Sequence, residues 1–226
     1  MSERYLSIIT NFGCHGKCPY CIVRENGIKV PKTTLAGLDA LTTVLKDTET
    51  NIISISGGGD PLHEYIKHVD WYRKLFSIVN NYYVNCSRYH IPVEMHTSYM
   101  TDETTFPFYD CKRVVYHPNT FGQLKHIRRT GNEIVRVVYV VTKDFTLEQI
   151  MNIAMFVADS KDIDELSFRQ LVGKGYEITD YWQDVLRFGH KKLWYYIEQS
   201  DYNIYYVEGK IYTEFSKIGE DYDRMQ

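Results

Sequence analysis

The 226-residue chain has no long run of residues of one chemical type. It has no stretch of about eighteen apolar residues, as a membrane-spanning helix requires, and no long basic run of the kind found on nucleic-acid-binding surfaces. Its formal net charge is −3. The first dozen residues contain acidic Glu3 and only a short apolar run, so they do not have the pattern of a signal peptide. We therefore expect a cytoplasmic protein with no membrane association, and nothing supports a nucleic-acid partner.

Cysteine is also scarce. The chain has five cysteines, an odd number, and three of them fall within residues 14–21, which leaves Cys86 and Cys111 elsewhere. This distribution argues against a disulfide framework and for a reducing compartment. The 44% hydrophobic content is enough to fill one core without covalent cross-links. We therefore expect a single domain.

Apolar runs of strand length alternate with segments of helical period through most of the chain, which is the pattern of repeated βα units. Runs such as VRVVYVV lack strict alternation, as expected of parallel strands that are covered on both faces. We predict an α/β fold, a partial (βα)6 TIM-like barrel. Its strands are expected at residues 5–10, 51–56, 93–98, 113–117, 134–142 and 165–171, and its helices near 34–46 (capped by Thr33 or Thr34), 63–82, 121–127 and after a capping box at Thr146 and Gln149.

The pattern changes after the sixth expected strand. We predict a helical segment rich in Trp and Tyr, broken near Gly189, and then a β-hairpin of YNIYYV and KIYTEF around Glu208 and Gly209. Residues 1–173 would form the barrel core, and residues 174–226 a Tyr-rich C-terminal extension of the same domain. This extension would cover the open side of the barrel or pair with a second subunit in a homodimer.

The clustered cysteines form the segment CHGKCPYC, which directly follows the first expected strand. Cys14, Cys18 and Cys21 are separated by three and then two residues, and they are one ligand short of a closed tetrahedral metal site. In βα barrels the loops at the carboxyl ends of the strands converge on the active site. Three thiolates on such a loop can hold three irons of an iron–sulfur cubane and leave the fourth iron open to a ligand that is not a protein side chain.

This segment resembles the CxxxCxxC signature of the radical S-adenosylmethionine (SAM) enzymes, in which an aromatic residue, here Tyr20, commonly precedes the third cysteine. The resemblance implies a [4Fe–4S] cluster held by Cys14, Cys18 and Cys21, with Tyr20 at the cofactor site and SAM bound at the unique iron. In this family the reduced cluster cleaves SAM to methionine and a 5′-deoxyadenosyl radical, which abstracts a hydrogen atom from the substrate. An external electron donor such as flavodoxin or ferredoxin is implied as a partner.

A second motif, SGGGDPL, ends the second expected strand. Glycines allow the backbone to approach a ligand closely, and a carboxylate suits an ammonium group. The same place in radical SAM enzymes holds a GGE-P motif that contacts the SAM amino group. Gly58, Gly59, Asp60 and Pro61 match it, with the shorter aspartate in place of glutamate. A glycine turn alone is weak evidence, and its specificity comes from the cysteine triplet one βα unit earlier.

The resemblance to radical SAM enzymes is weaker in the later strands. Thr97 and Ser98 end the third expected strand, where family members often present small polar side chains to SAM; the alternative is that they cap the next segment. Arg136 begins a run of valines that resembles the fifth-strand region of glycyl-radical activases and 7-carboxy-7-deazaguanine synthases. It is expected either to meet the SAM carboxylate or to point outward at the start of the strand.

Three further residues are candidates for substrate contact. Arg169 and Gln170 alternate on the sixth strand, so one of them faces the barrel interior, where a polar group needs a partner. His117 follows the fourth strand, although a lone histidine is more often structural. The sequence singles out no catalytic side chain.

Other classes of protein remain as alternatives. A zinc-binding module needs a fourth ligand, but His15 is awkwardly placed beside Cys14, and Cys86 and Cys111 are distant. A non-catalytic iron–sulfur electron carrier usually closes its cluster with a fourth cysteine and has little use for a glycine–acid motif. Three merely structural cysteines are the third alternative.

The substrate is open among a small molecule, a peptide, a nucleotide and a partner protein. A glycyl-radical activase and a 7-carboxy-7-deazaguanine synthase-like ring former both match the size of the chain. The residues before the first strand are too few for the substrate-binding glycine motif of the synthases. Cys86 and Cys111 are too few for the additional clusters of the extended peptide-modifying enzymes.

Overall fold

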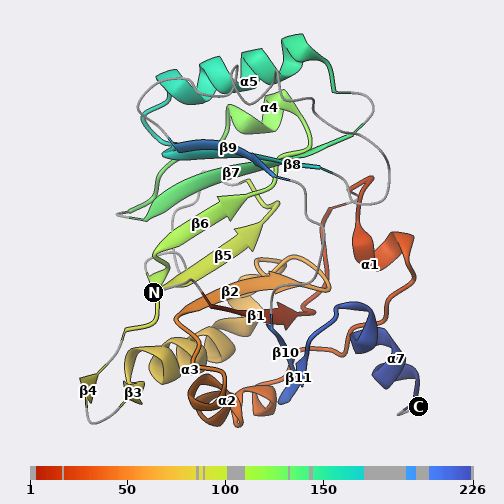
Figure 1. The fold of residues 1–226 in the computed structure, drawn as a ribbon, viewed down its shortest axis with the longest axis vertical. Helices are drawn as coiled ribbons and strands as arrows, with labels where there is room; N and C mark the ends of the chain where they lie inside the picture. The colour runs from red at the N-terminus through yellow and green to blue at the C-terminus, as the bar shows by residue number, and fades with distance from the viewer. Residues whose placement is uncertain are drawn as a thin grey trace. The chain divides into compact units, whose positions relative to one another are not determined.

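The fold is described from a computed structural model (Figure 1). It describes residues 4–16, 18–84, 87–88, 90–100, 110–131, 133–142, 145–170, 192–196 and 204–224. The chain divides into two compact units: unit 1 comprises Met1–Tyr99, Asp110–Lys112 and Asp201–Gln226, and unit 2 comprises Met100–Tyr109 and Arg113–Ser200. The expected boundary between barrel core and extension at residue 173 lies outside the described residues.

Unit 1 is built on a mostly parallel sheet with the strand order β11-β10-β1-β2-β5. β10, β1, β2 and β5 pair in parallel in this order, and β11 is antiparallel to β10. The first three barrel strands are therefore close to their predicted positions. The bounds are β1 (Tyr5–Thr10), β2 (Ile52–Gly57), β5 (Val93–Thr97), β10 (Ile204–Val207) and β11 (Lys210–Tyr212), with a separate antiparallel pair, β3 (Tyr83–Val84) and β4 (Ser87–Arg88).

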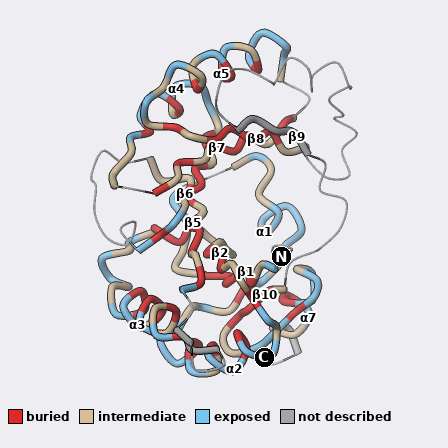
Figure 2. Tube along the Cα trace, turned by 60° about the vertical axis from the view of Figure 1, so that its left-hand side comes forward, coloured by how far each residue is buried: buried red, intermediate tan, exposed pale blue. Residues whose placement is uncertain are grey.

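One face of these strands is mostly apolar. Leu6 and Ile8 of β1 and Ile53 and Ile55 of β2 occupy alternating positions and are each 2% exposed or less. Burying a side chain of this size contributes about 1.5–3 kcal/mol. The long helices of unit 1 also turn buried stripes inward, and Figure 2 shows their outer sides exposed. The helices of unit 1 are α1 (Ile22–Glu25), η1 (Ala36–Leu38), α2 (Leu41–Asp47), η2 (Tyr65–His68), α3 (Val69–Asn80) and α7 (Ser216–Arg224).

The helix expected at residues 34–46 is divided into η1 and α2. Thr34 Oγ1 accepts a hydrogen bond from the Gly37 N–H at 3.1 Å, but the N-cap of η1 is the next residue, Leu35, and that of α2 is Ala40. Gly37 is a poor helix former, and its carbonyl accepts a hydrogen bond from the Tyr206 hydroxyl of β10. This contact with a distant strand explains why a helical pattern became a 3₁₀ turn followed by a shorter helix.

The predicted C-terminal hairpin is present as β10 and β11. Glu208 and Gly209 form its turn with φ angles of 47° and 83°, the left-handed conformation that a tight two-residue hairpin requires. The Glu208 carboxylate accepts hydrogen bonds from the backbone N–H and the hydroxyl of Thr34 at 3.0 and 2.5 Å. Together with the parallel pairing of β10 and β1, these bonds fix the hairpin to the segment that follows the cysteine loop.

Unit 2 contains parallel strands in the order β6-β7-β8-β9. The first three correspond to the last three predicted barrel strands. Within the predicted helical Trp- and Tyr-rich segment, residues 192–196 form the strand β9 instead, because LWYY consists largely of residues that favour strands and pairs with β8. The rest of that segment, with its expected break near Gly189, lies outside the described residues. The bounds are β6 (Arg113–Tyr116), β7 (Ile134–Val141), β8 (Glu165–Gln170), β9 (Lys192–Tyr196), α4 (Phe121–Leu124) and α5 (Leu147–Asp159).

The predicted capping box at the start of α5 gives a direct test of local stability. Thr146 Oγ1 accepts from the Gln149 N–H at 3.2 Å, and Gln149 Oε1 accepts from the Thr146 N–H at 2.8 Å. We expect Thr146→Ala to cost about 1 kcal/mol, which lowers Tm by about 2–4 °C in a chain of this length. Circular dichroism melting checks this, with the exposed helix-interior Thr43→Ala as control. An unchanged Tm for Thr146→Ala would contradict it.

The described elements confirm the predicted α/β class and agree with a partial TIM-like barrel, because mostly parallel strands alternate with helices in both units. Within the described part of the chain, no helix combines the length and the apolar character needed to cross a membrane.

Candidate functional site

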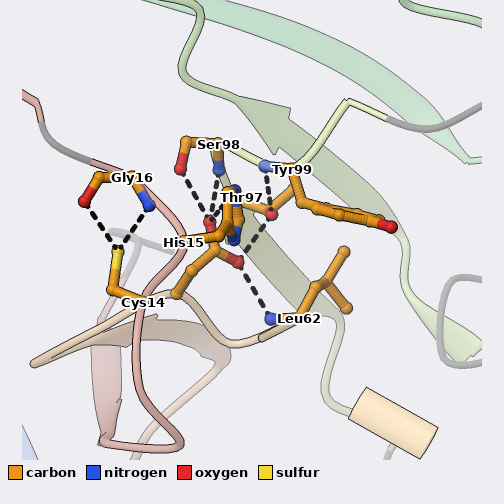
Figure 3. Close-up of polar contacts among 8 residues, drawn as sticks. Cys14, His15, Gly16, Leu62, Thr97, Ser98 and Tyr99 are labelled. Carbon is orange, nitrogen blue, oxygen red and sulfur yellow. Dashed lines mark hydrogen bonds and ion pairs between the residues drawn. The ribbon is translucent and has the colours of Figure 1, made fainter. Parts of the chain in front are cut away.

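The loops after β1, β2 and β5 leave the same edge of the sheet in unit 1. β1 and β2 pair in parallel up to Thr10 and Gly57, and β5 continues this arrangement beside β2. The cysteine loop (residues 11–21), the glycine loop (residues 58–64) and the end of β5 therefore converge (Figure 3). The sequence predicted this convergence, because carboxyl ends of parallel barrel strands meet at one edge.

The glycine loop packs directly on the cysteine loop. The Gly58 N–H donates to the Thr10 carbonyl at 2.8 Å, and the Asp60 N–H donates to the Gly13 carbonyl at 2.9 Å. A β-carbon on Gly59 would collide with this same Gly13 carbonyl. Close approach of the two backbones to each other therefore requires glycine at position 59.

The Asp60 side chain is buried at the centre of the site. Its Oδ1 accepts from the Leu62 N–H at 2.9 Å and from Thr97 Oγ1 at 2.8 Å. Its Oδ2 accepts from the Ser98 N–H at 2.7 Å and from Ser98 Oγ at 2.8 Å. Thr97 Oγ1 in turn accepts from the Tyr99 N–H at 2.9 Å. Thr97 and Ser98, which were predicted to contact SAM or to cap a segment, thus bind the carboxylate of the glycine loop (Figure 3).

The first two cysteines of the motif lie around Gly16. The Gly16 N–H donates to Cys14 Sγ at 3.3 Å. A β-carbon placed on Gly16 would lie 3.5 Å from both Cys18 Sγ and Ser98 Oγ and 3.7 Å from Cys14 Sγ. Cys21 follows a turn in which its N–H donates to the Cys18 carbonyl at 3.2 Å, and it caps the start of α1.

Burial and nearby negative groups disfavour the deprotonated, negatively charged forms of Cys14 and Tyr20 on this loop. Partial burial raises the pKa of the Cys14 thiol, the hydrogen bond from Gly16 opposes the rise, and the Asp60 carboxylate and the other two cysteines add to it. Burial also raises the pKa of the Tyr20 hydroxyl, with a smaller contribution from Cys18. A bound cation would reverse this preference for the thiol form, because coordination favours the thiolate.

The residues present suit an iron–sulfur centre in their chemistry. Three cysteines on one loop supply soft donors, and the absence of a side chain at Gly16 leaves space between two of the sulfurs and Ser98. Among the described residues, however, no three His, Cys, Asp or Glu side chains converge closely enough to hold a metal ion. The ligand set Cys14, Cys18 and Cys21 therefore stays a prediction.

The zinc alternative gains no fourth ligand from the described residues. His15 Nε2 faces Asp60 Oδ2 at 3.8 Å, and its ring lies edge-on to Tyr99 with centroids 5.1 Å apart. Cys111 is buried, at 6% exposure. Cys86 lies outside the described residues.

Arg136 lies near the amino end of β7 and is engaged within unit 2. Its Nε donates to Glu165 Oε2 at 2.8 Å, and Arg113 Nε lies 3.0 Å from the same oxygen. Glu165 begins β8, so the three side chains meet at the amino ends of neighbouring strands. These contacts pair Arg136 with Glu165, and both its contact with a SAM carboxylate and its outward direction stay predictions.

The three substrate candidates also belong to unit 2. His117 directly follows β6 and is half-buried. Arg169 is half-buried and shares one face of β8 with the buried Ser167. Gln170 is the last residue of β8, and its side chain is outside the described part of the chain. Their contact with a substrate stays a prediction.

The sequence reasoning missed a polar pair on β5. Glu94 is 3% exposed, and its Oε1 lies 3.6 Å from His96 Nε2. The strand sequence VEMHT contained the signal, because its polar residues alternate with Val93, Met95 and Thr97 and therefore share one face. Glu94 also pairs in register with Ser54 of β2, so this face of unit 1 carries polar groups across two strands.

No protein-family model matches the chain, and no curated protein matches its sequence. Solved structures match its fold. SuiB from Streptococcus suis, bound to S-adenosylmethionine, has a TM-score of 0.58 and 17% identity, over 88% of this chain and 48% of SuiB. SuiB bound to the precursor peptide SuiA has a TM-score of 0.60 and 15% identity, over 88% of this chain and 50% of SuiB.

The present chain thus spans about half the length of SuiB. At these identities the similarity establishes the fold. The chain has the fold of SuiB, a protein whose structure contains bound SAM.

Proposed function

We propose that the chain is a radical SAM enzyme in which Cys14, Cys18 and Cys21 hold a [4Fe–4S] cluster and the glycine loop helps to place SAM. The observation that carries this proposal is the packing of the glycine loop against the cysteine loop, through the hydrogen bond from the Asp60 N–H to the Gly13 carbonyl. In this proposal, two motifs from different parts of the sequence form one site at the carboxyl edge of the sheet.

The chain's own residues would bind and orient the cofactors. The three thiols would lose their protons on coordination, and the open backbone at Gly16 would leave room beside the sulfurs. When bound, the cluster supplies the electron that cleaves SAM to methionine and a 5′-deoxyadenosyl radical, which takes a hydrogen atom from the substrate. An external donor such as flavodoxin or ferredoxin would supply that electron.

We propose a peptide or protein as the substrate. SuiB, which has the same fold, has been solved with the precursor peptide SuiA, and this supports a peptide over a nucleotide or another small molecule. A glycyl-radical activase, which acts on a partner protein, is compatible with the same choice.

Anaerobic reconstitution with iron and sulfide, followed by addition of a reductant and SAM, tests the proposed function. We expect the absorbance of an iron–sulfur cluster, a SAM-induced change in its EPR spectrum and formation of 5′-deoxyadenosine. Metal analysis that finds zinc in place of iron, or a cluster that leaves SAM intact under reducing conditions, would refute the proposal.

A further inference from the structure

The Asp60 carboxylate has no acceptor position left for a SAM ammonium group. A carboxylate offers about four lone-pair directions. In this site they are taken by the Leu62 N–H, the Thr97 hydroxyl, and the N–H and hydroxyl of Ser98. His15 Nε2 also faces Oδ2 at 3.8 Å, and Asp60 is only 4% exposed. Binding an ammonium at this carboxylate would require one of these buried donors to lose its partner, which is costly.

The geometry also explains why this position holds aspartate, where the resembling family has glutamate. The bond from the Leu62 N–H to Asp60 Oδ1 joins a side chain to the backbone two residues later, which is an Asx turn. Glutamate has one more methylene, so its carboxylate would sit too far out to close this turn and bind Ser98 together. A residue that served only to offer a carboxylate to a ligand would not need this length.

We propose that Asp60 is a positioning residue, a latch that fixes the cysteine loop, the glycine loop and the end of β5 relative to one another. Its backbone N–H binds the Gly13 carbonyl of the cysteine loop, and its carboxylate binds Ser98 after β5. Ser98 Oγ and the sulfurs of Cys14 and Cys18 lie around the position that a β-carbon on Gly16 would occupy. By holding the cysteine loop and Ser98 together, the latch would fix the positions of these groups.

The proposal of a latch depends on the proposed function in one respect only, that the three thiols are cluster ligands. The contacts themselves exist in the protein without cofactors, so they can be tested in the reduced apoprotein. Asp60→Glu keeps the charge and lengthens the side chain, whereas Asp60→Asn keeps the length and places an amide where Ser98 donates. The exposed Asp70, on α3 of the same unit, provides the matched control Asp70→Asn.

In the apoprotein we expect both Asp60 variants to lower Tm by about 5–10 °C, because several buried hydrogen bonds are lost. Hydrogen exchange followed by NMR is expected to be faster at the Leu62 and Ser98 amides, and Asp70→Asn is expected to change neither measurement. Ser98→Ala, which removes one donor, is expected to lower Tm by about 2–4 °C. Its effect is expected to be smaller in the Asp60→Asn background, because the two residues share the interaction.

Measurements on the reconstituted protein distinguish a positioning role of Asp60 from an effect on stability alone. We expect Asp60→Glu to change the EPR spectrum of the reduced cluster before SAM is added, whereas Thr146→Ala, which lowers stability elsewhere, leaves it unchanged. Two results together would overturn the latch and identify Asp60 as a SAM ligand. The first is an Asp60→Glu variant with the Tm, amide exchange and EPR spectrum of the wild type. The second is an Asp60→Asn variant that loses only SAM affinity. Failure of the wild type to bind iron would refute the proposed function, while the apoprotein measurements would still decide the latch.

Discussion

Replacing Cys18 with alanine is expected to abolish both the iron–sulfur absorbance and the reductive cleavage of SAM. Cys18 is the middle cysteine of the motif, and its sulfur lies beside Gly16 and Ser98. Removing one of three thiolate ligands leaves two irons of the cubane without a protein donor, since one is already open to SAM. The cluster should then not assemble on reconstitution, and 5′-deoxyadenosine should fall to the level of a protein-free control.

The matched control for this experiment is Cys111→Ala. Cys111 is a buried cysteine of the same unit and does not belong to the motif. Its replacement is expected to keep the iron content, the absorbance and SAM cleavage of the wild type. Thermal melting of the two apoproteins shows whether each variant is folded. A folded Cys18→Ala variant that retains a full cluster and forms 5′-deoxyadenosine would contradict the assignment of the ligands.

Local sequence signals predicted much of the fold. The runs around Ile8, Ile53 and Val138 became strands because each places buried residues at strand spacing, and Thr146 began a helix because its partner Gln149 lies three residues away. The hairpin at Gly209 followed from its turn residues. In these cases the deciding interactions lie within a few residues, so a single sequence is enough to find them.

Interactions between distant segments account for what the sequence did not predict. The Tyr206 hydroxyl reaches Gly37 across 169 positions and accompanies the division of the expected helix. Two partners of Asp60, at the end of β5 and directly after it, lie 37 and 38 positions away. No periodicity in the sequence indicates which of several polar groups a buried carboxylate will meet, so the site could be located from its motifs while the role of Asp60 could not.

Gly59→Ala is expected to destabilise the folded protein by about 3 kcal/mol, near the upper end of what an overpacked side chain costs. The added β-carbon would collide with the Gly13 carbonyl, and this contact cannot be relieved by a change of rotamer. Either the glycine loop or the cysteine loop must move, which strains the hydrogen bond between Asp60 and Gly13. In a chain of this length the corresponding loss of Tm is roughly 6–12 °C, measurable by calorimetry on the apoprotein.

Gly122→Ala is the matched control, because the same methyl group is added where there is room. Gly122 lies in α4, and its added β-carbon would be 3.7 Å from Thr120 Oγ1, an ordinary contact. Alanine favours helix over glycine, so this variant is expected to keep or slightly raise Tm. If Gly59→Ala instead had the Tm of the wild type, the glycine loop and the cysteine loop could not be packed as closely as their backbone contact implies. The convergence of the two motifs, on which the proposed site depends, would then have to be abandoned.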